Sequence, residues 1–200
     1  MLAKLKTYAI IAVVGFVAIS YFLPESEQTA DLGQVLDRTE YAITSYQGYL
    51  EENKIAEATD VQVEEFREFY VQVLNSDPRF YDKAMGLDIQ SDGKFLGYAD
   101  ANSNGTQDSS EGDLFTVEID EENRRLIATD LAGNSSGLRF SATGLIAGAL
   151  IGNMLGRQRA AGISKASFNN RSVTPRSSYK APSSAARSSS ARSGGLRAGK

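Results

Sequence analysis

A polar stretch at residues 100–111 carries the chemistry that is easiest to read from this sequence. Asp100, Asp108 and Glu111 bring carboxylates, and Asn102 and Asn104 bring amide oxygens at alternate positions. A hard divalent cation takes six to eight oxygen ligands, and alternate positions in a tight loop can supply them from one short segment. The stretch therefore predicts a calcium site. The alternative is a polar surface loop that only turns the chain.

The same residues follow the spacing D-x-[DN]-x-[DN]-G-x5-E and resemble the calcium loop of EF-hand proteins. The resemblance covers this stretch alone. Gly105 stands where the family needs a sharp turn, but Gln107 replaces the usual aliphatic residue, and strand-like runs flank the loop in place of helices. A paired EF-hand is therefore not expected. The resemblance implies these calcium ligands: Asp100, Asn102, Asn104, Thr106 through its backbone carbonyl, Asp108 and Glu111.

The catalytic inventory is short, because the chain contains no histidine and no cysteine. Their absence excludes disulfides, thiol nucleophiles, serine–histidine catalysis and histidine–zinc sites. A carboxylate-only enzyme remains the alternative, but no paired carboxylates accompany a nucleophile. We therefore expect a non-enzymatic protein.

The helices and strands expected around the loop together form an α+β domain. Apolar residues recur at helical spacing over 32–50 and 59–74, and Thr59 with Gln62 forms a capping-box signal at the second start. We expect a helical hairpin in residues 24–80, with its aromatic stripes packed in the core. Strand-like runs separated by turn signals predict a small antiparallel sheet of four or five strands in residues 81–140, carrying the hairpin on one face.

Charge is sorted along the chain. All 25 acidic residues lie between Glu25 and Asp130, whereas ten of the 21 basic residues lie in residues 157–200. Such sorting is typical of a chain whose parts lie on opposite sides of a membrane. Residues 1–23 are apolar after Lys4 and Lys6, and predict an N-terminal transmembrane helix. A cleaved signal peptide is the alternative. In both cases residues 24–140 are expected outside the cytoplasm.

A second apolar segment, residues 141–156, carries glycine at every fourth position. Gly144, Gly148, Gly152 and Gly156 resemble a glycine zipper, which implies a membrane-helix partner or self-association. A re-entrant or interfacial helix and a glycine-rich linker are the alternatives. The Ser/Arg-rich residues 157–200 predict a disordered basic tail on the cytoplasmic leaflet, with both termini in the cytoplasm.

These features together predict a function without naming a partner. We expect a non-enzymatic envelope protein, anchored in a cell membrane and most consistent with a bacterial inner membrane. Its extracytoplasmic calcium-binding domain would scaffold an assembly or bind a partner. The alternative is a secreted or periplasmic binding module whose glycine-rich segment and basic tail attach to an anionic envelope surface. Nucleic acid is not an expected partner, because the tail lacks interleaved aromatic residues.

Overall fold

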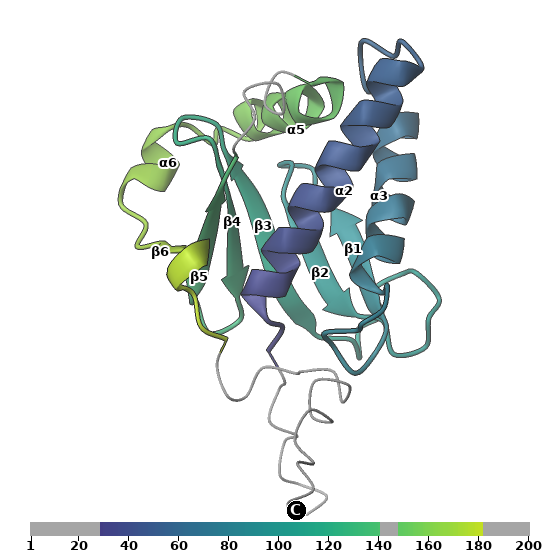
Figure 1. Ribbon diagram of the computed structural model, residues 1–200, viewed down its shortest axis with the longest axis vertical. Helices are drawn as coiled ribbons and strands as arrows, with labels where there is room; N and C mark the ends of the chain where they lie inside the picture. Colours follow the sequence, from purple (N-terminus) through teal and green to yellow (C-terminus); the bar gives the residue numbers. More distant parts are fainter. Residues whose placement is uncertain (1–28, 141–147, 182–200) are drawn as a thin grey trace, which may run out of the picture.

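In the computed structural model, which describes residues 29–140 and 148–181, a six-stranded sheet is covered on one face by two long helices (Figure 1). The elements are, in chain order, α2 (Leu32–Glu52), α3 (Asp60–Leu74), β1 (Met85–Ile89), β2 (Phe95–Ala99), β3 (Asp113–Asp120), β4 (Arg125–Asp130), β5 (Ser135–Arg139), α5 (Ala149–Ala160), α6 (Ala166–Asn169), β6 (Thr174–Pro175) and the 3-10 turn η1 (Arg176–Ser178). The α+β class predicted from the sequence is therefore confirmed.

The helical hairpin begins where side chains cap its helices. The Asp31 side chain accepts a hydrogen bond of 2.9 Å from the Gly33 N–H at the start of α2. At the start of α3 the Thr59 N–H donates to Gln62 Oε1 at 3.1 Å, as the capping-box signal predicts. The apolar faces of both helices are buried against the sheet, with α3 over β1 and α2 over β4 and β5.

The sheet is an antiparallel meander from β1 to β5, and the two-residue β6 adds to β5 in parallel. Each edge is partly covered. At β1, Asn75, the C-cap of α3, donates to the Met85 carbonyl at 2.8 Å and accepts from the Met85 N–H at 2.9 Å. At β5, the short β6 occupies the edge. An unpaired edge strand is a template for pairing with another chain, and this sheet offers little such template.

Helix α5 is part of the core of this domain. Leu150, Ile151 and Met154 are fully buried in the same cluster as the hairpin and the sheet. The Leu150 N–H donates to Gln47 of α2 at 3.4 Å, and α5 lies against the upper end of α2 (Figure 1). In the described part of the apolar run that resembled a membrane segment, Leu150, Ile151, Met154 and Leu155 are therefore buried against protein.

The zipper glycines do not form a packing face within the described residues. A Cβ built on Gly152 or Gly156 would meet nothing within 4 Å, and both residues are exposed. Gly148 is the exception, since a Cβ there would lie 1.5 Å from Gln47 Nε2. Its missing side chain makes room for the buried amide of Gln47. Gly144 lies outside the described residues.

The transmembrane part of the predicted fold is wrong for the region that can be tested. Within residues 29–140 and 148–181, no helix combines the length and apolar character needed to cross a membrane. Helix α5 has only 12 residues, and its C-terminal half carries Arg157 and Arg159. This overturns the membrane-spanning prediction for the glycine-rich segment. Residues 1–23, predicted as an anchor or signal peptide, lie outside the described residues.

The basic tail is ordered as far as residue 181, which corrects the prediction of disorder from residue 157 onward. We call residues 157–181 the basic strap, because they run around the domain and pair with its acids. The pairs are Arg157–Asp60 at 2.7 Å, Arg159–Glu121 at 3.0 Å, Lys165–Glu122 at 3.8 Å, Arg171–Glu118 and Arg176–Asp37. The acidic residues 29–130 and the basic strap thus belong to one folded unit, and five of the ten basic residues in 157–200 form ion pairs inside it.

The strap covers part of the sheet face that α2 and α3 leave open. Arg171 pairs there with Glu118 of β3, which is only 4% exposed. The Arg171 guanidinium also lies 5.2 Å from the ring centroid of Phe168, the buried residue of α6. A Cβ on Gly137 of β5 would come within 2.6 Å of Val173, so the strap passes close over that strand.

Candidate partner-binding groove

The predicted calcium loop joins β2 to β3, and its own hydrogen bonds hold it. Asp100 is 5% exposed and accepts from the N–H groups of Asn104 and Gly105, both at 3.0 Å. Glu111 accepts from Ala101 N–H at 2.8 Å and from Asp108 N–H at 3.1 Å. Gly105 has a φ of 74°, a left-handed conformation that suits glycine at a sharp turn.

The remaining predicted ligands also bond within the loop. Asn102 and Asn104 donate through Nδ2 to Asp108 Oδ2, at 2.7 and 3.1 Å, and the Thr106 N–H donates to Asn104 Oδ1 at 2.8 Å. Among the described residues, no group of three or more acidic side chains is placed to hold a metal ion. This contradicts the prediction of a calcium-binding protein. The structure brings the predicted residues together, but as a hydrogen-bonded turn.

Replacing Asp100 with alanine is expected to lower the free energy of unfolding by about 1–3 kcal/mol, because the N–H groups of Asn104 and Gly105 lose a charged acceptor. Urea denaturation in the presence of a chelator measures this loss, so that no ion contributes. Ser109→Ala in the exposed part of the same loop is the control and should change stability by less than about 0.5 kcal/mol. Equal effects of the two variants would contradict the role given to Asp100.

A second feature, on the outer side of the helical hairpin, has the character of a binding surface. Two neighbouring cavities of about 450 and 490 Å³ lie between α2 and α3, and Phe69 lines both. We call them the lower and upper cavities and the continuous surface the groove. The lower cavity is lined by Asp37, Arg38, Tyr41, Phe69, Gln72, Val73 and Ser76. The upper cavity is lined by Ser45, Tyr46, Tyr49, Glu65 and Phe69.

The spacing of the two cavities follows from the two helices. On α2, Tyr41 lines the lower cavity and Tyr49 the upper one, eight positions later; on α3, Val73 and Glu65 are separated by the same number. At 1.5 Å per residue the two cavities lie about 12 Å apart along the hairpin. The groove therefore contains two cavities that are separated by about two helical turns.

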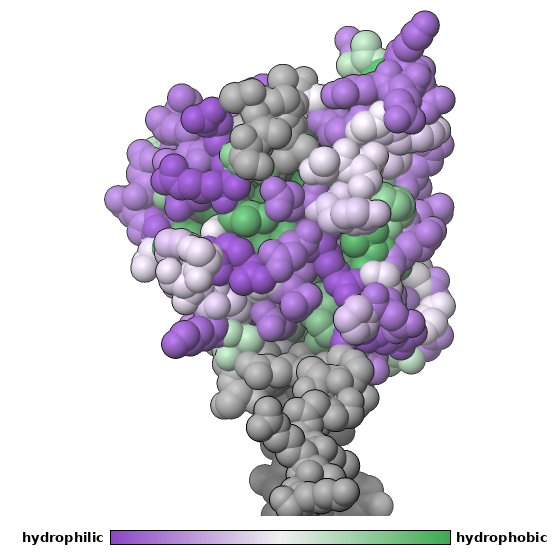
Figure 2. All heavy atoms as spheres, in the orientation of Figure 1, coloured by the Kyte–Doolittle hydropathy of each residue, from purple (hydrophilic) through white to green (hydrophobic). Residues whose placement is uncertain are grey.

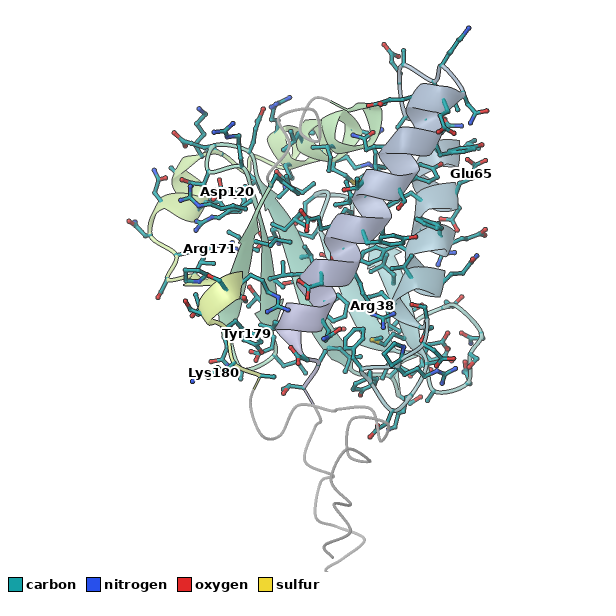
Figure 3. The ribbon with its side chains drawn as sticks, in the orientation of Figure 1. Arg38, Glu65, Asp120, Arg171, Tyr179 and Lys180 are labelled. Atoms are coloured by element: carbon teal, nitrogen blue, oxygen red, sulfur yellow. The ribbon has the colours of Figure 1, made fainter. Side chains whose placement is uncertain are left out.

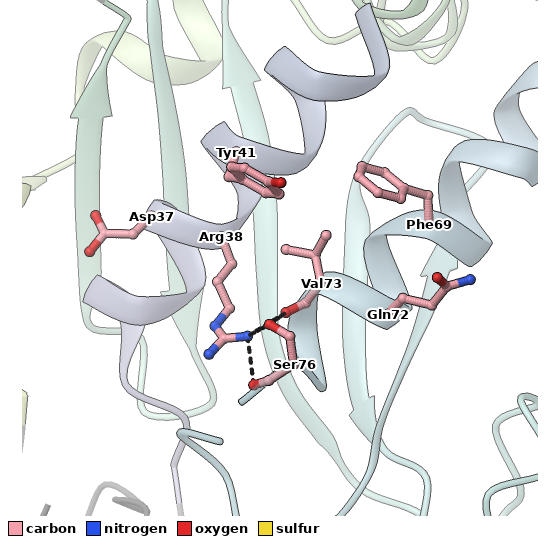
Figure 4. A pocket seen from close by; sticks show the side chains of 7 residues that line it. All are labelled: Asp37, Arg38, Tyr41, Phe69, Gln72, Val73 and Ser76. Atoms are coloured by element: carbon pink, nitrogen blue, oxygen red, sulfur yellow. Dashed lines mark hydrogen bonds between the residues drawn. The ribbon is translucent and has the colours of Figure 1, made fainter. Parts of the chain in front are cut away.

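The lower cavity has a fixed polar end and an apolar side (Figure 4). Arg38 donates to the Val73 carbonyl and to Ser76, and at 2.7 Å to the Pro78 carbonyl. Burial lowers the pKa of the Arg38 guanidinium, against the opposing effect of Asp77. Tyr41 and Phe69 face each other above it. Tyr41 is 61% exposed.

The upper cavity is built from three aromatic rings and one carboxylate. The ring centroid of Tyr46 lies 5.5 Å from that of Tyr49 and 6.4 Å from that of Phe69. The Tyr46 hydroxyl donates to Glu65 Oε2 at 2.9 Å. Burial, followed by this hydrogen bond, raises the pKa of the Tyr46 phenol, so the phenol stays neutral and continues to donate. Tyr49 is 46% exposed at the rim.

The surroundings of the groove are acidic. The hairpin region, residues 29–76, contains ten Asp or Glu and three Lys or Arg. Burial raises the pKa of the Glu40 carboxyl, and the nearby Asp37 raises it further. Figure 2 shows apolar surface between the two helices with hydrophilic residues around it. Arg38 and Glu65 mark the two ends of this surface (Figure 3).

Sequence reasoning missed this site because it assigned the aromatic stripes to the core. That assignment holds for Phe66 and Tyr70, which are fully buried. The available signal was a second stripe on α2, Tyr41, Ser45 and Tyr49, at steps of four residues on the face opposite the aliphatic one. Two aromatic residues on the polar face of an amphipathic helix indicate a contact surface.

Comparison of the chain with protein-family models, with curated proteins and with solved structures gives no match. The proposed function therefore rests on the geometry and the charge of the groove.

Proposed function

We propose that this protein is a non-enzymatic binding domain, and that the groove between α2 and α3 takes an amphipathic helix of a partner protein. The observation that carries the proposal is the pair of aromatic cavities about 12 Å apart along the hairpin. A helix presents side chains at i and i+7 or i+8 at this separation on one face. Helix-in-groove recognition uses such anchor residues.

The acidic surroundings of the groove favour a basic helix as the partner. The hairpin carries ten acidic residues against three basic ones, and two of the acids, Asp37 and Asp60, pair with Arg176 and Arg157 of the strap. The remaining excess of negative charge around an apolar contact raises the association rate with a basic partner and excludes acidic partners. The partner is thus a helix with one anchor for each cavity on one face and Lys or Arg beside them.

A scaffolding role is favoured over catalysis by the state of the polar groups at the groove. Arg38 is engaged with backbone carbonyls of α3 and of the segment after it, and Glu65 accepts from Tyr46. These groups shape the cavity walls. The chain also lacks histidine and cysteine, the residues most often used as base or nucleophile at neutral pH.

The test is titration of the isotope-labelled protein with an idealised Leu/Lys amphipathic helix of about 15 residues, the length that spans α3. Backbone amide shifts in α2 and α3 should change, and Tyr41→Ala should weaken binding about tenfold, as expected for an exposed aromatic contact residue. Leu131→Ala is the matched control, because Leu131 is a large apolar residue, 49% exposed, that lies outside the groove.

Two results would count against the proposal. If the same peptide with glutamate in place of lysine binds equally well, the partner is not selected by charge. If Tyr41→Ala binds like the wild type while Leu131→Ala does not, the peptide binds elsewhere on the domain.

A further inference from the structure

The upper cavity differs from the lower one in the chemistry of its walls. Its lining is three aromatic rings, the short side chain of Ser45 and a single carboxylate. Among the described residues, no basic side chain lines it. The lower cavity, in contrast, contains the Arg38 guanidinium as well as the Asp37 carboxylate. Two neighbouring cavities that differ in charge in this way favour different anchors on the same ligand.

We propose that the upper cavity is a cation site, in which Tyr46, Tyr49, Phe69 and Glu65 enclose an alkylammonium group such as the head of a lysine side chain. The inference rests on the proposed function, because it identifies one of the two anchors of the partner helix. The other anchor, for the lower cavity, is apolar.

The ring geometry supports this assignment. Tyr46 is tilted by 38° to Tyr49 and by 29° to Phe69, with centroid distances of 5.5 and 6.4 Å. Tyr46 is only 6% exposed and stacks on Phe69, so the exposed ring of Tyr49 and the half-buried ring of Phe69 are the ones that offer surface to a ligand. Aromatic ring faces carry negative electrostatic potential, and they attract an ammonium group within about 6 Å of the centroid.

Glu65 gives the site its counter-charge. Its carboxylate accepts a hydrogen bond from the Tyr46 hydroxyl at 2.9 Å, which holds it at the cavity wall. Glu65 itself is exposed, so a cation that enters the cavity meets a charged oxygen while its methylene groups contact the rings. The volume of about 490 Å³ is sufficient for a complete lysine side chain.

The experiment compares choline with dimethylbutanol, in which carbon replaces the charged nitrogen. Both are titrated into the full chain, and the ring and amide signals of Tyr49 and Phe69 are followed by NMR. Choline should bind about tenfold more tightly than its neutral isostere, since the ring faces attract only the charged form. Tyr49→Leu, which keeps an apolar side chain, should remove this preference, and Tyr49→Phe should retain it.

Glu65→Gln tests the carboxylate separately, because the amide oxygen can still accept from Tyr46. It should weaken choline binding about threefold and leave dimethylbutanol unchanged. Tyr41→Leu is the matched control and should leave choline binding intact.

Equal affinity of choline and dimethylbutanol, or a Tyr49→Leu variant that still prefers choline, would overturn the inference. The outcome is separate from the peptide test. If the Leu/Lys helix binds through Tyr41 but choline shows no preference, the proposed function stands and the cation site fails. If choline is preferred and the helix does not bind, the cation site stands and the helix proposal fails.

Discussion

Leu150→Ala is expected to lower the free energy of unfolding by about 2–5 kcal/mol, because a fully buried leucine in a packed core leaves a cavity behind. Leu150 is 0% exposed and lies in the core cluster with the hairpin and the sheet. Chemical denaturation of the purified full chain, followed by far-UV circular dichroism, measures the change.

Gly152→Ala is the control on the same helix and should have the opposite sign. Gly152 is exposed, and a Cβ there would meet nothing within 4 Å. Alanine in a helix interior is more stable than glycine by about 0.5–1 kcal/mol. A glycine-zipper helix would instead lose its partner contact on this substitution. A destabilised Gly152→Ala together with a neutral Leu150→Ala would contradict the position of α5.

Arg171→Ala is expected to cost about 2–4 kcal/mol of stability, because it leaves the Glu118 carboxylate covered by protein without its cation. Glu118 is 4% exposed, and Arg171 also donates to its Oε1 through Nη2 at 3.2 Å. The Arg171 side chain is itself 37% exposed, so solvent reduces the loss below that of a fully buried pair. Urea denaturation of the full chain measures it.

The control for Arg171 is Arg159→Ala, which breaks the exposed pair with Glu121 and should cost less than about 0.5 kcal/mol. Adding Glu118→Gln to Arg171→Ala should recover part of the lost stability, because the buried charge is removed. If Arg171→Ala and Arg159→Ala have the same small effect, Glu118 does not depend on the strap.

The sequence was sufficient for those parts of the fold that local rules govern. Helical spacing predicted both helices of the hairpin, Thr59 with Gln62 predicted where the second one begins, and turn signals between strand-like runs predicted the antiparallel sheet. In each of these cases the residues that decide the structure are close together in the chain. Residues 29–140 therefore matched the predicted α+β arrangement.

Helix α5 could not be assigned from its own residues. An apolar run indicates that side chains avoid water, but Leu150 and Ile151 satisfy this requirement equally well against lipid or against another part of the protein. The deciding contacts come from α2, more than a hundred residues earlier in the chain. Local hydropathy contains no information about such a partner.

The prediction of disorder for the strap was wrong for a related reason. A segment with so few large apolar residues is typically disordered. In this fold, however, Phe168 is buried, and Arg171 and Arg176 pair with acidic residues that come much earlier in the chain. Charge sorting was correctly recognised, but complementary charges within one fold produce the same pattern as a membrane boundary.

The groove was missed because the exposure of Tyr41 and Tyr49 depends on how the two helices face each other.

The late position of α5 in the chain has a consequence for synthesis on the ribosome. The hairpin and strands β1 to β5 are complete when Arg139 has been made, but Leu150, Ile151 and Met154 have not yet emerged. A nascent chain of that length carries an uncovered apolar surface at the upper end of α2. Domains fold as units during translation, so this one closes only when α5 leaves the exit tunnel, and any translational pause before that point prolongs the exposure of the apolar surface to chaperones and proteases.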